Sequence, residues 1–187
     1  MIFIGVDPGV HGAIAHLEEP QQLEVYPMPL IGDKEYDIQQ IKKIITPQVG
    51  KNYYAAIERQ HCMPGEGLPR TFKTGFGYGG LLYMFAALNI SHGIVDAKTW
   101  QSRIFKGQPS KQDTKVSSGI IATRLYPNVN FRISERARTI ADGMTDAACI
   151  ATYAQRFYGQ KLEPEQTCVH KVLANNPDVC IKCGEMV

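Results

Sequence analysis

Phe3-Ile4-Gly5-Val6-Asp7-Pro8-Gly9 is a short apolar run that ends in one carboxylate and a turn. The run is β-prone, and Pro8 and Gly9 predict a turn directly after it. A second apolar run, residues 13–17, follows at once. The stretch therefore predicts a β-hairpin with Asp7 at the end of its first strand. Asp7 either caps this turn or binds a ligand beside the backbone, and other parts of the chain must decide between the two.

The rest of the first 158 residues predicts an α/β fold with a mixed sheet flanked by helices. Three successive strands followed by alternating helices and strands are typical of a meander joined to helical crossovers. Further strands are expected over residues 23–26, 53–58 and 92–95, and helices over 38–45 with Asp37 as N-cap, 76–88, 110–126 and 134–158. Residues 59–74, rich in glycine and proline, predict a loop.

Length and composition are those of one globular domain with a sizeable core. The chain has 187 residues, of which 44% are hydrophobic and 20% charged. A polar composition begins after Gly159, so we expect a domain over residues 1–159 and a tail over 160–187. No stretch is apolar enough to cross a bilayer and no signal peptide is visible, so no membrane is expected as a partner. The cysteines form no disulfide framework, which indicates a reducing compartment such as the cytoplasm.

Basic residues are concentrated in one part of the sequence. The net charge of the whole chain is only +2, but residues 98–138 contain nine Lys or Arg and two Asp or Glu. A one-sided positive surface is the footprint of a polyanionic partner such as nucleic acid. The alternative is a solvated, lysine-rich face without a partner.

Four carboxylates have a context that suggests a shared site. Asp7 and Glu58 each end an apolar strand, and Asp142 and Asp146 lie four apart on the last helix, hence on one face. Like charges on a partly buried face are unfavourable unless a cation compensates them. Clustered carboxylates suit Mg²⁺ or Mn²⁺, and two such ions can support phosphodiester hydrolysis. Each acid by itself could equally be a cap or a solvated residue.

Three motifs carry a resemblance to a known family: residues 3–9, Ala56-Ile57-Glu58-Arg59-Gln60, and Asp142-Gly143-Met144-Thr145-Asp146-Ala147 followed by Ile150-Ala151. In this order and spacing the chain resembles the RuvC-type Holliday junction resolvases over about residues 1–158, most closely the phage and organelle variants. The resemblance implies an RNase H-like fold with a five-stranded mixed sheet. It also implies a homodimer that makes paired nicks in four-way DNA junctions during recombination or repair.

The resemblance further implies a site with two Mg²⁺ or Mn²⁺ ions. The family's four catalytic, metal-binding acids correspond to Asp7, Glu58, Asp142 and Asp146. Bacterial members commonly place the last two acids three apart, whereas here they are four apart and Gly143 follows the first, so Asp146 is the closer match. The compartment implied is the cytoplasm of a bacterial or phage-infected cell, or an organelle matrix.

Several side chains are expected to contact DNA. Basic residues can hold phosphates, and an aromatic side chain after the second acid can stack on unpaired bases at the junction centre. Phe72 and Phe76 could instead belong to the core or to a dimer interface, Arg136 and Arg138 could pair with Glu135, and Trp100 is interpreted as a packing residue. The predicted DNA-binding residues are Arg59, Phe72, Lys73, Lys106, Lys111, Lys115, Arg136 and Arg138.

The C-terminal tail contains a possible zinc site. Cys168 and His170 form a C-x-H pair, and Cys180 and Cys183 form a C-x-x-C-G pair. Four soft ligands in two close pairs suit a structural tetrahedral Zn²⁺. The resemblance does not extend to this tail, and the alternative is a disordered segment with reactive thiols.

Other functions remain open at the level of sequence. The same fold serves nucleases that act on other DNA or on RNA–DNA hybrids, and a junction-binding protein without catalysis would keep the basic surface. An actin-like ATPase would also use an Asp-Pro-Gly turn, but the chain is too short for that duplicated architecture and has no second matching loop.

Overall fold

The computed structural model describes residues 1–32, 34–62, 65–109, 112–159, 172–173 and 176–180. The main sheet and the two short hairpins consist of β1 (Ile2–Asp7), β2 (Ala13–Glu18), β3 (Gln22–Pro27), β4 (Leu30–Ile31), β5 (Glu35–Tyr36), β6 (Tyr53–Glu58), β7 (Ser91–Val95), β8 (Val172–Leu173) and β9 (Asn176–Cys180). The helices are α1 (Ile38–Ile45), α2 (Leu68–Ala87), α3 (Ala97–Ile104), α4 (Thr114–Leu125) and α5 (Asp142–Tyr158).

The five-stranded mixed sheet is confirmed. Its strand order is β3-β2-β1-β6-β7, with β1 in the centre. Strands β1, β2 and β3 form an antiparallel meander, whereas β6 and β7 run parallel to β1. The parallel strands are joined by helical crossovers, as such connections require.

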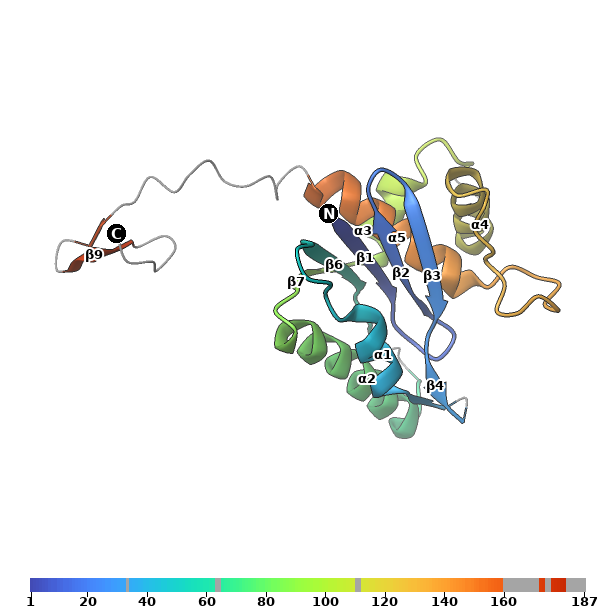
Figure 1. Cartoon of the computed structure of the whole chain (residues 1–187). Helices are drawn as coiled ribbons and strands as arrows, with labels where there is room; N and C mark the ends of the chain where they lie inside the picture. Colours follow the sequence, from blue (N-terminus) through green and yellow to red (C-terminus); the bar gives the residue numbers. More distant parts are fainter. Residues whose placement is uncertain (33, 63–64, 110–111, 160–171, 174–175, 181–187) are drawn as a thin grey trace.

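Helices cover both faces of the sheet, as Figure 1 shows. Strand residues alternate between the two faces, and the two hydrophobic cores follow that alternation. Phe3 of β1 and Ala56 of β6 belong to the core that contains buried residues of α3, α4 and α5. Ile4 and Ile57 belong to the second core, with buried residues of α1 and α2. The near-continuous apolar runs seen in the sequence are thus strands buried on both sides.

Helix α5 packs directly on the central strand because Gly5 has no side chain. A Cβ atom at Gly5 would lie 2.2 Å from the carbonyl oxygen of Ala147 and 2.3 Å from the backbone nitrogen of Ala151. Any larger residue in this position would force the helix away from β1. The glycine in the opening stretch therefore sets the distance between the first strand and the last helix.

Two helix boundaries differ from the sequence prediction. Helix α2 begins at Leu68, so the loop expected over residues 59–74 was wrong in its second half; Pro69 stands in the first turn, where a helix tolerates proline. Helix α5 begins at Asp142 rather than at residue 134, with Ala141 as its N-cap. The segment before it, residues 134–141, is irregular and mostly exposed, because its few apolar residues do not recur at helical spacing.

Two further differences concern the basic segment. Residues 97–104 form the helix α3, which the sequence prediction missed. Helix α4 begins at Thr114 with Asp113 as N-cap, whose side chain accepts a hydrogen bond from the Lys115 backbone N–H. Residue 110, where the sequence predicted the start of this helix, lies outside the described residues.

The tail is described only in part. Strands β8 and β9 form a small antiparallel hairpin in which Val172 pairs with Cys180. Cys168, His170 and Cys183 lie outside the described residues, so the zinc site stays a prediction. Within the part of the chain that the structure describes, no helix has the length and apolar character needed to cross a membrane.

Candidate active site

Asp7 and Glu58 meet at one edge of the sheet. Val6 pairs with Ile57 in the parallel β1–β6 ladder, which places Asp7 and Glu58 side by side as the last residues of their strands. Asp7 shares the strand face of Phe3 and Gly5, and Glu58 shares the face of Ala56. Both carboxylates therefore lie on the face of the sheet that α5 covers.

The first turn of α5 brings the other two acids to the same edge. Gly143 lies against the turn between β1 and β2, where a Cβ atom would be 2.1 Å from the carbonyl oxygen of His11. This close approach puts Asp142 and Asp146 beside the end of β1. Asp146 is partly buried, whereas the side chain of Asp142 is 48% exposed. Gly143, noted above as a departure from the bacterial pattern, is what permits the contact.

The charges of these acids interact. Burial raises the pKa of Asp7 well above its ordinary value, and the carboxylates of Glu58, Asp146 and Asp142 raise it further. Burial likewise raises the pKa of Asp146 to about 6, with Glu58 and Asp142 adding to the effect. The structure thus brings all four predicted acids into one electrostatic cluster.

The four acids have the charge and the donor atoms of a cation site, but their side chains are not arranged around one common point. The oxygen-only donors and their mutual repulsion suit a hard divalent cation. In the part of the chain that is described, however, no group of three or more His, Cys, Asp or Glu side chains is arranged to hold a metal ion. Two of the carboxylates each have one oxygen in contact with a protein group, Oδ2 of Asp142 with a lysine and Oε2 of Glu58 with an indole.

Helix α4 supplies two partners to the acids. The Nζ atom of Lys115 lies 2.9 Å from Oδ2 of Asp142, and this contact raises the pKa of Lys115. The side chain of Ser118 interacts with Asp146 and opposes the rise in the pKa of that carboxyl. The sequence predicted Lys115 as a phosphate contact and did not identify Ser118, whose place on the buried side of α4 is seen only in the structure.

Trp100 was interpreted from the sequence as a packing residue only. It is fully buried, which confirms the packing interpretation, but its indole Nε1 also donates a hydrogen bond of 2.7 Å to Oε2 of Glu58. This bond opposes the rise that burial causes in the pKa of Glu58. The two residues are 42 positions apart in the sequence, so no local sequence pattern predicts their contact.

Tyr36 fixes the turn after Asp7. The backbone N–H of Gly9 donates a hydrogen bond of 2.7 Å to the Tyr36 hydroxyl. The Tyr36 ring lies against α2 at Gly77, where a Cβ atom would be 2.9 Å from it. Burial raises the pKa of Tyr36 to about 12, with Asp7 adding to the effect, so the hydroxyl is neutral when it holds the turn.

The other described residues of the predicted DNA-binding set lie on α2 or outside regular elements. Arg59 directly follows Glu58, and its Nε lies 2.9 Å from Oδ1 of Asp96. Phe72 and Lys73 are exposed on α2, not in a loop as expected. The remaining three described residues of this set, Lys106, Arg136 and Arg138, are exposed outside regular elements, and Lys111 lies outside the described residues.

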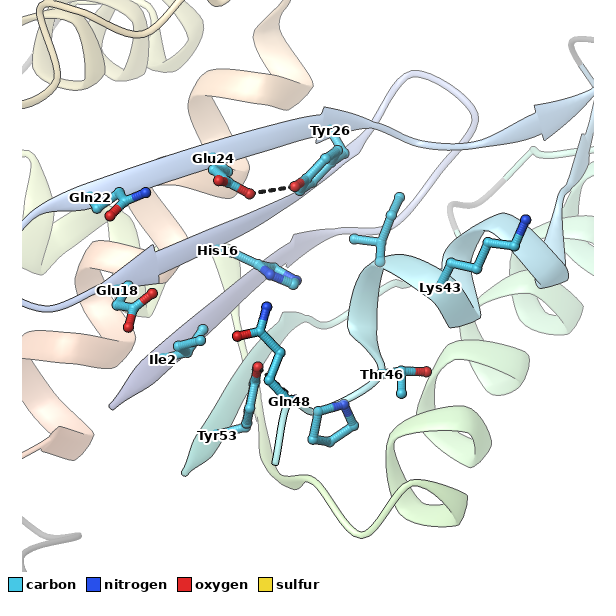
Figure 2. Close-up of a pocket in the computed structure, with 12 residues that line it drawn as sticks. Ile2, His16, Glu18, Gln22, Glu24, Tyr26, Lys43, Thr46, Gln48 and Tyr53 are labelled. Carbon is cyan, nitrogen blue, oxygen red and sulfur yellow. Dashed lines mark hydrogen bonds between the residues drawn. The ribbon is translucent and has the colours of Figure 1, made fainter. Parts of the chain in front are cut away.

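A hollow of about 530 Å³ lies on the opposite face of the sheet. Figure 2 shows His16 and Tyr26 from β2 and β3 facing Lys43 of α1 and Gln48 across it. None of the four acids lines this hollow. We therefore locate the candidate active site at the edge formed by β1, β6 and α5, not in this hollow.

Comparison with known proteins gives matches at the level of structure. No protein-family model and no curated protein sequence matches the chain. Solved structures do, among them Thermus thermophilus RuvC in complex with Holliday junction substrate, Thermus thermophilus RuvC, and the yeast mitochondrial Holliday junction resolvase Ydc2.

The matches cover most of each chain at low sequence identity. The two RuvC structures have 13% and 15% identity and TM-scores of 0.50 and 0.53, and each match covers 86% of this chain and 96% of the other. Ydc2 has 15% identity and a TM-score of 0.53, over 84% of this chain and 79% of the other. The chain therefore has the RNase H-like fold of the RuvC-type Holliday junction resolvases.

Proposed function

We propose that the chain is a metal-dependent endonuclease that makes paired nicks in four-way DNA junctions during recombination or repair. The observation that carries the proposal is the convergence of Asp7, Glu58, Asp142 and Asp146 at the edge where β1 and β6 end and α5 begins. The fold shared with the resolvases supports it. The cytoplasm of a bacterial or phage-infected cell, or an organelle matrix, remains the proposed compartment.

The four carboxylates are the proposed ligands of two Mg²⁺ or Mn²⁺ ions. When bound, such ions would activate water and stabilise the leaving oxygen of a phosphodiester. The raised pKa of Asp7, caused by burial and by three neighbouring carboxylates, supports this role because a cation would relieve that repulsion. Lys115 already places one positive charge on Asp142, and its ammonium group is well placed to contact a phosphate that approaches this edge.

The exposed face of α2 is the proposed dimer interface. Phe72 and Phe76 are each 71% exposed and Tyr83 is 79% exposed, and all three lie on the helix face opposite the buried Leu81 and Phe85. Large apolar side chains that gather, exposed, on one helix face mark an interaction site. Phe72 and Phe76 are thus not core residues, and both are assigned here to the interface, which leaves base stacking by Phe72 as the alternative.

Phe76→Glu is expected to turn the dimer into a monomer, because it places a charge in the centre of this apolar face. Sedimentation velocity at micromolar concentration should give about half the wild-type mass. Gln39→Glu is the matched control, since Gln39 is exposed on α1 and is not part of the apolar face of α2. A wild-type protein that is already monomeric, or a Phe76→Glu variant of unchanged mass, would contradict the interface.

Zinc removal tests the proposed tail site. We expect about one equivalent of Zn²⁺ per chain after purification without added metal, bound by Cys168, His170, Cys180 and Cys183. Replacing Cys180 and Cys183 with serine should abolish this zinc, whereas Cys62→Ser should not, because Cys62 lies outside the set. A zinc content far below one equivalent, with folding unaffected by chelation, would reject the site.

A panel of substrates tests the function itself. The protein with Mg²⁺ is compared on a synthetic four-way junction, a linear duplex of the same sequence and an RNA–DNA hybrid. We expect symmetric nicks in the junction and little cutting of the other two. Preferential cutting of the hybrid or the linear duplex would favour another RNase H-like nuclease. Junction binding without cutting would favour a non-catalytic binding protein.

A further inference from the structure

Trp100 and Glu58 form a buried, directed contact. The indole Nε1 donates to Oε2 of Glu58 at 2.7 Å. Trp100 itself is fully buried in α3 and packs edge-on against Phe105, with 5.3 Å between ring centroids. A buried indole N–H requires an acceptor, and it can serve only as a donor. The surrounding core therefore fixes the direction in which the bond points.

A neutral donor acts on a carboxylate differently from a cation. The indole orients Glu58 while leaving its negative charge uncompensated, whereas Lys115 both orients Asp142 and neutralises it. One N–H also occupies only one carboxylate oxygen, so Oε1 stays available to another partner. Glu58 is thus held in place and remains attractive to a positive ion.

We propose that Trp100 is a positioning residue that presents Oε1 of Glu58 to the divalent cation. The inference rests on the proposed function, in which Glu58 is a metal ligand. Glu58 ends a strand and is only partly buried, so without the indole its side chain would sample several rotamers. Holding one rotamer before the ion arrives reduces the entropy lost on binding. Outer-shell partners of metal ligands typically contribute this way.

Trp100→Phe removes the N–H and keeps an aromatic ring in the core. We expect Mg²⁺ affinity, measured by calorimetry, to fall about tenfold, and the Mg²⁺ concentration for half-maximal junction cleavage to rise by a similar factor. Phe105→Leu is the matched control, because it disturbs the same packing without touching Glu58; its Mg²⁺ affinity should stay within about twofold of the wild type.

A double-mutant cycle separates positioning from a general structural effect. In a Glu58→Gln background the charge that Trp100 orients is gone, so Trp100→Phe should cause no further loss of Mg²⁺ affinity. A tenfold loss in both backgrounds would overturn the proposal, because it would show that Trp100 acts through the fold and not through Glu58.

The wild-type protein offers a second readout that does not depend on the folding of any Trp100 variant. The chain contains one tryptophan, so its indole N–H gives a single proton–nitrogen NMR signal. Titration with Mg²⁺ should move this signal with the same apparent Kd that calorimetry gives, and Glu58→Gln should abolish the movement. A stationary signal while Mg²⁺ binds would overturn the positioning role alone. A wild-type protein that neither binds Mg²⁺ nor cuts a junction would overturn the proposed function, and this inference with it.

Discussion

Asp146→Asn is expected to lower Mg²⁺-dependent cleavage of a four-way junction about 10³-fold, while the affinity for the junction stays within about twofold of the wild type. The substitution keeps the size of the side chain and an oxygen that can accept from Ser118, but removes the charge. It also removes repulsion with Glu58 and Asp142, so the fold should not suffer. Single-turnover cleavage and a gel-shift assay in EDTA measure the two quantities separately.

Asp37→Asn is the matched control for this experiment. Asp37 caps α1 by accepting a hydrogen bond from the Gln40 backbone N–H, and asparagine caps helices about equally well. The same chemical change away from the acidic cluster should leave cleavage unchanged. If Asp146→Asn also cuts at the wild-type rate, the proposed site is wrong.

Asp7→Asn is expected to stabilise the metal-free protein at pH 8 by about 2 kcal/mol. In the folded state the pKa of Asp7 is well above its ordinary value and that of Asp146 is about 6, both chiefly through burial. Groups with raised folded pKa values contribute stability that is present at low pH and is lost as the pH rises through those values. Wild-type stability should therefore fall as the pH rises from about 4 through the folded pKa of Asp146 near 6, and further through the raised pKa of Asp7, in the absence of metal.

Urea unfolding in EDTA at pH 5 and pH 8 measures this effect. His16 acts in the opposite direction, because burial lowers its pKa and acid then destabilises the fold. The difference between wild type and Asp7→Asn cancels that contribution, since His16 is common to both. Added Mg²⁺ should recover the lost stability of the wild type at pH 8. An Asp7→Asn variant less stable than the wild type at pH 8 would show that the buried carboxylate is compensated in some other way.

The strands and the four acids were predictable because their patterns are local. An apolar run that stops at a carboxylate defines both the strand and the residue at its end, as at Asp7 and Glu58. Strand alternation then places both carboxylates on one face once the pairing of β1 with β6 is known. The spacing of Asp142 and Asp146 similarly predicts one helical face.

The features that the sequence did not predict depend on contacts between segments that are far apart in the chain. The start of α2 was missed because glycines and prolines dominate the local pattern, while Leu81 and Phe85, which anchor the helix, come two turns or more later. The bond from Trp100 to Glu58 and the contacts of α4 with the acids exist only after folding, because α3 and α4 must first pack on α5. The role of Gly143 likewise becomes visible only when its neighbour, the carbonyl of His11, is known.

The most direct test of the central claim is cleavage of a supercoiled plasmid that extrudes an inverted repeat as a four-way junction. Two nicks made within one binding event convert this plasmid to linear DNA, whereas independent single nicks release it as a relaxed circle. With Mg²⁺ we expect linear product from wild-type protein, none in EDTA and none from Asp146→Asn. Relaxed circles alone would contradict paired nicking. Equal cutting of a plasmid without the inverted repeat, or no cutting of either plasmid, would contradict a junction-specific endonuclease.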